Sequence, residues 1–189
     1  MRLIILLGTL AIAVPFIIAQ AAMPSGNAVS LRFLERPTNI GNPKYTVPPE
    51  VAKVESLGAD SLLAWVQSRP QSARGYAFYV MPLDVLYLIC LGLFLGYAST
   101  LLVDVTHWPA TLSPIPMWVV WLLPAAYIVC DLAEDLLIIV MLGWPTTIHA
   151  GAFAPLSLFR TLKIASVGIS FGQVFLLCLV SFVWPAAKV

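Results

Sequence analysis

The feature that most constrains this chain is an apolar run from Met117 to Leu142 that is interrupted by three carboxylates. The run is long enough for a helix to cross a lipid bilayer. Glu134 and Asp135 follow Asp131 by three and four residues, so all three side chains project from one face of a helix. Carboxylates at that depth are costly and normally face protein, water or a counter-charge. The fold must therefore give this acidic face a partner other than lipid.

Composition places the chain among membrane proteins. Of its 189 residues, 60% are hydrophobic and only 10% are charged, whereas a soluble domain has about 25% charged residues. We therefore expect an integral membrane protein that contacts the lipid bilayer. The net charge of +1 gives no reason to expect a nucleic-acid partner. The cysteines lie in apolar runs without a CxxC pattern, which favours plain packed thiols over a disulfide framework or a zinc site: Cys90, Cys130 and Cys178.

Four apolar segments predict an all-α fold in which four transmembrane helices form a bundle. Two interpretations of the first segment stay open. It is either an uncleaved anchor that Pro15 kinks or a signal peptide with a small-x-small cleavage site at residues 19–21. The expected spans are 1–22, 78–103, 117–142 and 157–184, followed by a tail at 185–189.

Residues 23–77 form the long hydrophilic segment and are expected outside the membrane as a partly helical first loop. One short helix is expected over 50–58, where two prolines precede the first turn and Gly58 provides a stop. A second short helix is expected to begin near Asp60 and to end at Pro70. The segment is either a helical hairpin on the membrane surface or a plain connecting loop.

Positive charges give conflicting indications of orientation. With four spans, both termini share a side with the 104–116 link, and Arg2 favours the cytoplasm for that side. The 23–77 loop carries six Lys and Arg residues and the 104–116 link carries none, which favours the reverse. A loop of that length is close to the limit at which the positive-inside rule loses force. We expect cytoplasmic termini and residues 23–77 outside.

Depth along the helices predicts one layer of charge. At 1.5 Å per residue, Asp84, Glu134 and Lys163 lie roughly 9, 15 and 12 Å from helix ends on the side of the long loop. We therefore expect a single binding or structural cluster that comprises Asp84, Asp131, Glu134, Asp135, Arg160 and Lys163. Supporting polar groups are the hydroxyls of two tyrosines and a stripe on the last helix, spaced by three and four residues: Tyr87, Tyr127, Ser166, Ser170 and Gln173.

Four carboxylates in this cluster face one Arg and one Lys, which leaves a net charge of −2 if all are ionised. Unpaired buried charge costs on the order of several kcal/mol per ion. The excess is balanced if one or two carboxyls are protonated, if a cation or cationic ligand binds, or if water or Arg74 reaches the cluster. The cluster then acts as a structural lock, as a site for a ligand, ion or proton, or, least favoured, as an enzyme site.

Catalytic motifs are absent from the sequence. No Gly-rich phosphate loop, HExxH or GxSxG occurs, so nothing indicates a hydrolase or a kinase. A histidine with two carboxylates can bind a divalent metal, and His149 is expected near the mouth of the cluster. It has no second histidine at helical spacing, and His107 is expected on the opposite side of the membrane. No metal and no cofactor is predicted.

Four short motifs resemble a group of small bacterial four-helix membrane proteins. The motifs are a Pro-Glu-Val helix ending in Leu-Gly (Tyr45–Gly58), Pro-Leu-Asp (Pro82–Asp84), an Asp-x-x-Glu helix (Leu123–Asp135) and Thr-Leu-Lys (Thr161–Lys163). The resemblance implies the four-span topology and a bacterial plasma membrane, but it brings no activity. That group is expected to carry Asn where this chain has Asp135, so the chain departs from it by one extra charge.

These observations favour a non-catalytic membrane protein, namely an accessory or scaffold subunit of a larger membrane assembly. Its partners would be other membrane-protein subunits. The alternative is a protein that binds or transports a small cationic ligand, a lipid or a proton through the intramembrane Asp/Glu/Lys cluster. A membrane-embedded enzyme that modifies lipids is the third possibility.

Overall fold

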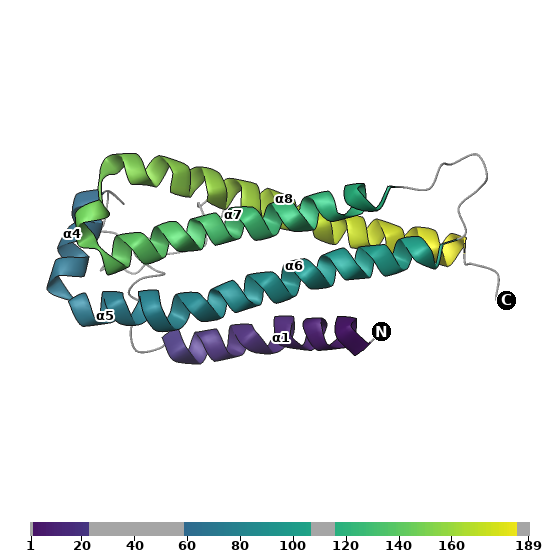
Figure 1. The fold of residues 1–189 in the computed structure, drawn as a ribbon, viewed down its shortest axis with the longest axis horizontal. Coiled ribbons are helices and arrows are strands. Elements are labelled where there is room, and N and C mark those ends of the chain that lie inside the picture. The colour runs from purple at the N-terminus through teal and green to yellow at the C-terminus, as the bar shows by residue number, and fades with distance from the viewer. Residues whose placement is uncertain (1, 23–58, 107–115, 185–189) are drawn as a thin grey trace, which may run out of the picture. The chain divides into compact units, whose positions relative to one another are not determined.

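A computed structural model describes residues 2–22, 59–106 and 116–184. These residues form helices joined by short turns and contain no strand, so the predicted all-α class is confirmed for them. The longest helices are those that the apolar runs predict (Figure 1). In chain order the elements are α1 (Arg2–Ala22), α4 (Ala59–Ser68), α5 (Pro70–Gly75), the π-helical turn η2 (Tyr76–Val80), α6 (Met81–Asp104), α7 (Met117–Gly143), the 3-10 turn η3 (Pro145–Thr147) and α8 (Ala150–Val183).

Two helices among the described residues are long and apolar enough to cross a membrane. One is the continuous helix Pro70–Asp104, which combines α5, η2 and α6, and the other is the Ala154–Val183 part of α8. The apolar part of α1, Arg2–Ile18, is shorter. Length and composition thus support a membrane location and give two candidate spans among the described residues.

Two helices begin earlier than the apolar pattern indicates. The helix expected from residue 78 begins at Pro70, because a proline fits the first turn of a helix, where its missing N–H has no partner to lose. The last helix, expected from residue 157, begins at Ala150 and continues through Pro155. Pro155 lies within the first turns of α8, so its missing N–H removes a hydrogen bond only near the helix end. The turn before α8 is correspondingly short.

The chain divides into two compact units. The unit boundaries fall within α1, α6, α7 and α8. Among the described residues, unit 1 comprises 2–14, 85–106, 116–133 and 158–184, and unit 2 comprises 15–22, 59–84 and 134–157.

Close helix approach at two glycines organises unit 1. A Cβ at Gly92 would lie 2.3 Å from Cγ1 of Ile128, and a Cβ at Gly96 would lie 2.4 Å from Cζ3 of Trp121. The GxxxG pattern of α6 therefore receives side chains of α7, which runs antiparallel beside it (Figure 1). The buried core between these segments contains Leu88, Leu91, Leu95 and Tyr127.

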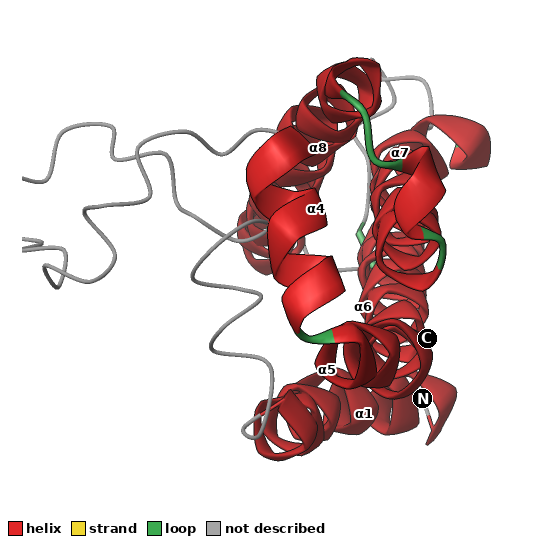
Figure 2. Ribbon diagram, turned by 90° about the vertical axis from the view of Figure 1, so that its left-hand side faces the viewer, coloured by secondary structure: helices red, strands yellow, loops and turns green. Residues whose placement is uncertain are grey.

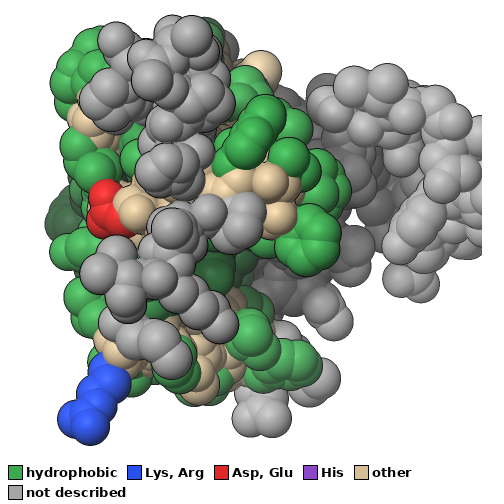
Figure 3. Space-filling model, turned by 90° about the vertical axis from the view of Figure 1, so that its right-hand side faces the viewer, with side chains coloured by type: hydrophobic (Ala, Val, Ile, Leu, Met, Phe, Trp, Pro, Cys, Tyr) green, Lys and Arg blue, Asp and Glu red, His purple; other side chains and the backbone are tan. Residues whose placement is uncertain are grey.

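The outer face of α8 is apolar. Only 17% of the most apolar 18-residue window of this helix is buried, which is unlike the core helix of a soluble protein. Large hydrophobic side chains are exposed along it: Ile164, Ile169, Phe171, Phe175, Leu176 and Phe182. Figure 3, which views the right-hand end of Figure 1, shows hydrophobic side chains over much of the described surface there.

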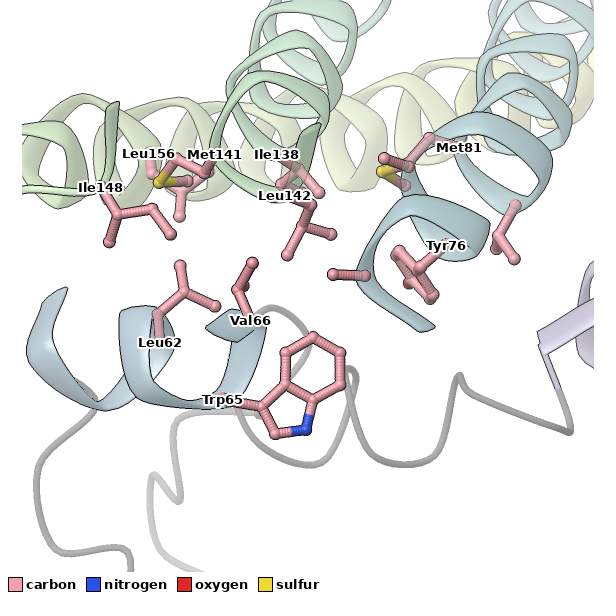
Figure 4. Packing of buried hydrophobic residues seen from close by; sticks show 13 residues of the cluster. Leu62, Trp65, Val66, Tyr76, Met81, Ile138, Met141, Leu142, Ile148 and Leu156 are labelled. Atoms are coloured by element: carbon pink, nitrogen blue, oxygen red, sulfur yellow. The ribbon is translucent and has the colours of Figure 1, made fainter. Parts of the chain in front are cut away.

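Unit 2 is built around a hydrophobic core to which α4 contributes (Figure 4). Leu62, Trp65 and Val66 form the buried side of α4, and α4 ends at Ser68, before Pro70. Figure 2 shows α4 lying between α5 and the start of α8. Residues of α5, η2, α6, α7, α8 and the turn before α8 complete the core: Ala73, Tyr76, Ala77, Val80, Met81, Ile138, Met141, Leu142, Ile148 and Leu156.

The second expected loop helix is thus a packed element of unit 2 rather than part of a plain connecting loop. The helix expected over 50–58 lies outside the described residues, as does the 185–189 tail. The expected anchor over 1–22 corresponds to α1, which is helical through Pro15.

Candidate functional site

An ion pair joins α7 to α8 in the interior of unit 1. Lys163 Nζ donates a hydrogen bond to Asp131 Oδ1 at 2.6 Å. The Asp131 side chain is 6% exposed and the Lys163 side chain is 25% exposed. Tyr127, one helical turn before Asp131, is also buried. The first carboxylate of the acidic face therefore has its counter-charge on the last helix, where the polar stripe lies.

The six residues of the expected charge cluster fall in both units. Unit 1 contains Asp131, Arg160 and Lys163, whereas unit 2 contains Asp84, Glu134 and Asp135. The structure brings Asp131 and Lys163 into contact. A single cluster of all six residues stays a prediction. The depth estimate that suggested it used helix starts that differ from those of α5 and α8.

Two carboxylates in unit 2 are almost completely buried. Glu134 is 2% exposed and Asp135 is 1% exposed, whereas Asp84 is half-buried. Each of the three takes part in at least one polar or electrostatic interaction. Their burial agrees with the rule that charged groups on apolar helices turn away from lipid.

The serines of the polar stripe satisfy their hydroxyls within α8. Ser166 Oγ donates to Leu162 O at 2.7 Å, and Ser170 Oγ donates to the carbonyl oxygen of Ser166 at 2.7 Å. Both serines are buried in unit 1, so this face of α8 points inward. Hydroxyls bonded in this way have an acceptor within their own helix, so their hydrogen-bonding capacity is met without a ligand.

Gln173, at the far end of the stripe, connects three helices. Its Nε2 donates to Ser99 Oγ of α6 at 3.0 Å and to Val120 O of α7 at 2.8 Å. The sequence did not identify Ser99 as a partner, although it follows Gly96 by three residues and therefore lies on the same face of α6. Ser99 is fully buried in unit 1.

A second polar contact between α6 and α7 was also missed. Trp121 Nε1 donates to Thr100 Oγ1 at 3.1 Å, and its ring meets the Tyr97 ring edge-on with centroids 5.2 Å apart. A tryptophan near a helix end suggests only a membrane interface from sequence. Its hydrogen bond to Thr100 depends on the close approach that Gly96 permits.

Metal and thiol chemistry receive no support from the geometry. Within the part of the chain that the structure describes, no group of three or more His, Cys, Asp or Glu side chains is arranged to hold a metal ion. His149 is exposed in the turn before α8, and His107 lies outside the described residues. The cysteines Cys90, Cys130 and Cys178 are free thiols.

Comparison with known protein families, curated proteins and solved structures finds no match to this chain. The resemblance to small bacterial four-helix membrane proteins therefore stays a prediction. Function is inferred from the residues of this chain and their contacts.

Proposed function

We propose that this protein is a non-catalytic integral membrane protein that serves as an accessory or scaffold subunit of a larger membrane assembly. In this proposal α1, α6, α7 and α8 cross the bilayer as a four-helix bundle. The apolar outer face of α8 supports a lipid-facing position, because a soluble protein would bury such a helix.

The observation that carries the scaffold role is the Asp131–Lys163 ion pair. The Lys163 ammonium already has a carboxylate partner at 2.6 Å inside unit 1. Paired buried charges constrain how two helices sit against each other, since removal of either partner leaves an uncompensated charge. Together with the Gln173 contacts, the pair supports a fixed helix arrangement rather than an open binding site.

Small residues on α8 support contact with another membrane helix. Apart from the backbone of α8 itself, no described atom lies within 4 Å of a Cβ built at Gly168 or Gly172, whereas Gly92 and Gly96 are covered by side chains of α7. Small residues spaced four apart on an exposed membrane helix lie on one face and permit close approach of a second helix. A subunit that packs against partners needs such a face.

Charge reversal tests the scaffold role. We expect Asp131→Lys and Lys163→Asp each to reduce the yield of folded protein in mild detergent, because each leaves two like charges facing each other. The double variant restores an opposite-charge pair and should recover both folded yield and any bound partner subunit. Recovery of folding without recovery of the partner would contradict the role of the pair as a structural lock in an assembly.

A second candidate, a site for a lipid, a small cation or a proton, is favoured by one observation. Glu134 and Asp135 are buried at adjacent positions on an apolar helix, and such groups often mark ion or proton pathways. Under this alternative, Glu134→Gln abolishes binding or transport while the folded yield stays unchanged. Loss of folded yield would return these carboxylates to a structural role.

The proposed orientation has cytoplasmic termini and residues 23–77 outside the cell. A fluorescent reporter that matures only in the cytoplasm, fused to the C-terminus, tests whether the C-terminus is cytoplasmic. A phosphatase that is active only outside the plasma membrane, inserted within residues 23–58, tests whether the long loop lies outside. Activity of both reporters supports the orientation, and the reverse pattern would contradict it.

A further inference from the structure

Pro124 creates a gap in the hydrogen bonding of α7. It lies inside the helix and is fully buried. A proline has no backbone N–H, so the carbonyl four residues earlier, that of Val120, receives no donor from position 124. Helices bend most readily at such a gap. In an apolar environment, the free carbonyl must find a donor elsewhere.

The side chain of Gln173 on α8 supplies that donor. Its Nε2 lies 2.8 Å from Val120 O, and the second N–H of the same amide donates to Ser99 Oγ at 3.0 Å. The opposite orientation of the amide would place its oxygen against a carbonyl oxygen, so the contact with Val120 fixes the orientation. Both donors of the amide are thereby used.

The surroundings exclude water as an alternative donor. Val120 is 3% exposed and packs in a hydrophobic cluster with Val103 and Leu177, while Ser99 is completely buried. A carbonyl in such surroundings depends on a protein donor. All of these residues belong to unit 1.

We propose that Gln173 substitutes for the N–H that Pro124 lacks and thereby holds closed a hinge in α7 between Val120 and Pro124. The segment of α7 that precedes the hinge stays in line with the rest of the helix while the amide is engaged. Release of the amide frees α7 to bend at this point. This conformational device does not depend on the scaffold role, because it concerns only contacts within unit 1.

Selective isotope labelling can observe the Val120 carbonyl directly. The dipeptide Val–Trp occurs twice in the chain, at 120–121 and 183–184. Protein labelled with ¹³C-carbonyl valine and ¹⁵N-tryptophan therefore gives two carbonyl–amide correlation signals, and Val183 serves as an internal reference. In Gln173→Met, which removes the donors and keeps the side-chain length, the Val120 carbonyl signal should shift upfield while the Val183 signal stays in place. An unchanged Val120 signal would overturn the proposal.

A variant that restores the missing donor gives the decisive comparison. In Pro124→Ala the backbone N–H of residue 124 can reach Val120 O, so Gln173 is no longer needed there. We expect Gln173→Met to lower the thermal unfolding midpoint by about 2–4 °C in the natural background and by at most half as much in Pro124→Ala. Equal losses in both backgrounds would overturn the proposal.

Ser99→Ala is the matched control, because it removes the other partner of the same amide and should lower the midpoint equally in both backgrounds. If Gln173→Met alone gives no folded protein, Pro124→Ala should rescue its folding, and failure of that rescue would also count against the hinge.

Discussion

Replacing Lys163 by methionine should destabilise the protein substantially, because it leaves Asp131 as a buried carboxylate without its ion-pair partner. Removing one member of a fully buried pair costs about 3–5 kcal/mol. The Lys163 side chain is 25% exposed, so the pair is only partly buried, and we expect a smaller loss of about 2–3 kcal/mol. For a chain of this length, that loss lowers the unfolding midpoint by about 4–12 °C.

The assay is thermal unfolding of purified protein in one mild detergent. Unfolding is monitored by size-exclusion chromatography as the loss of monodisperse protein after heating. Arg74→Met is the matched control, because it removes a cation from an exposed position and should change the midpoint little. The double variant Asp131→Leu with Lys163→Met removes both charges and should recover at least half of the loss, since apolar replacement of a whole buried pair is often neutral.

A loss of less than about 0.5 kcal/mol in Lys163→Met would place the pair among those that contribute little to stability. A double variant as unstable as the sum of its single variants would show that the two side chains do not interact energetically. Either result would refute the structural-lock interpretation of the ion pair.

Two further predictions concern the contact between α6 and α7. Gly92→Ala places a Cβ 2.3 Å from Ile128 and should cost about 1–3 kcal/mol in the same unfolding assay of the isolated chain. Gly168→Ala is the control, because a Cβ there meets no described atom within 4 Å beyond the backbone of its own helix. It should cost no stability in the chain without a partner, since alanine is the better helix former. A loss in Gly168→Ala equal to that in Gly92→Ala would contradict the packing. Trp121→Phe removes the indole donor to Thr100 and should cost about 0.5–1.5 kcal/mol for the hydrogen bond. Adding Thr100→Val to it should cost little more, whereas a fully additive loss would indicate that the hydrogen bond contributes nothing.

The helical class followed from the sequence because long apolar runs have few alternatives to helices. Helix starts were harder to place, because proline has two opposite effects. Pro70 ends one helix and begins the next, and Pro155 lies inside α8 although it resembled a boundary. A missing N–H is harmless in the first turn of a helix and costly further inside it, and the sequence alone does not give that register.

Helical periodicity identified which face of each helix is polar but not which neighbour that face meets. Asp131 and Lys163 belong to one predicted cluster because they lie at a common depth along their helices, and the structure shows that these two form an ion pair. Ser99 and Thr100 are isolated polar residues in an apolar run, so their partners depend on how closely α6 and α7 approach. That distance is set by Gly96 and by the side chain that covers it.

The most direct test of the scaffold proposal is native mass spectrometry of the protein released from membrane patches, with the Asp131→Lys/Lys163→Asp double variant measured in parallel. For a scaffold subunit, we expect the 20.5 kDa chain to be released with a partner polypeptide, in the natural protein and in the double variant alike. Release of the natural chain alone, or with a bound small molecule that the charge reversal abolishes, would contradict it.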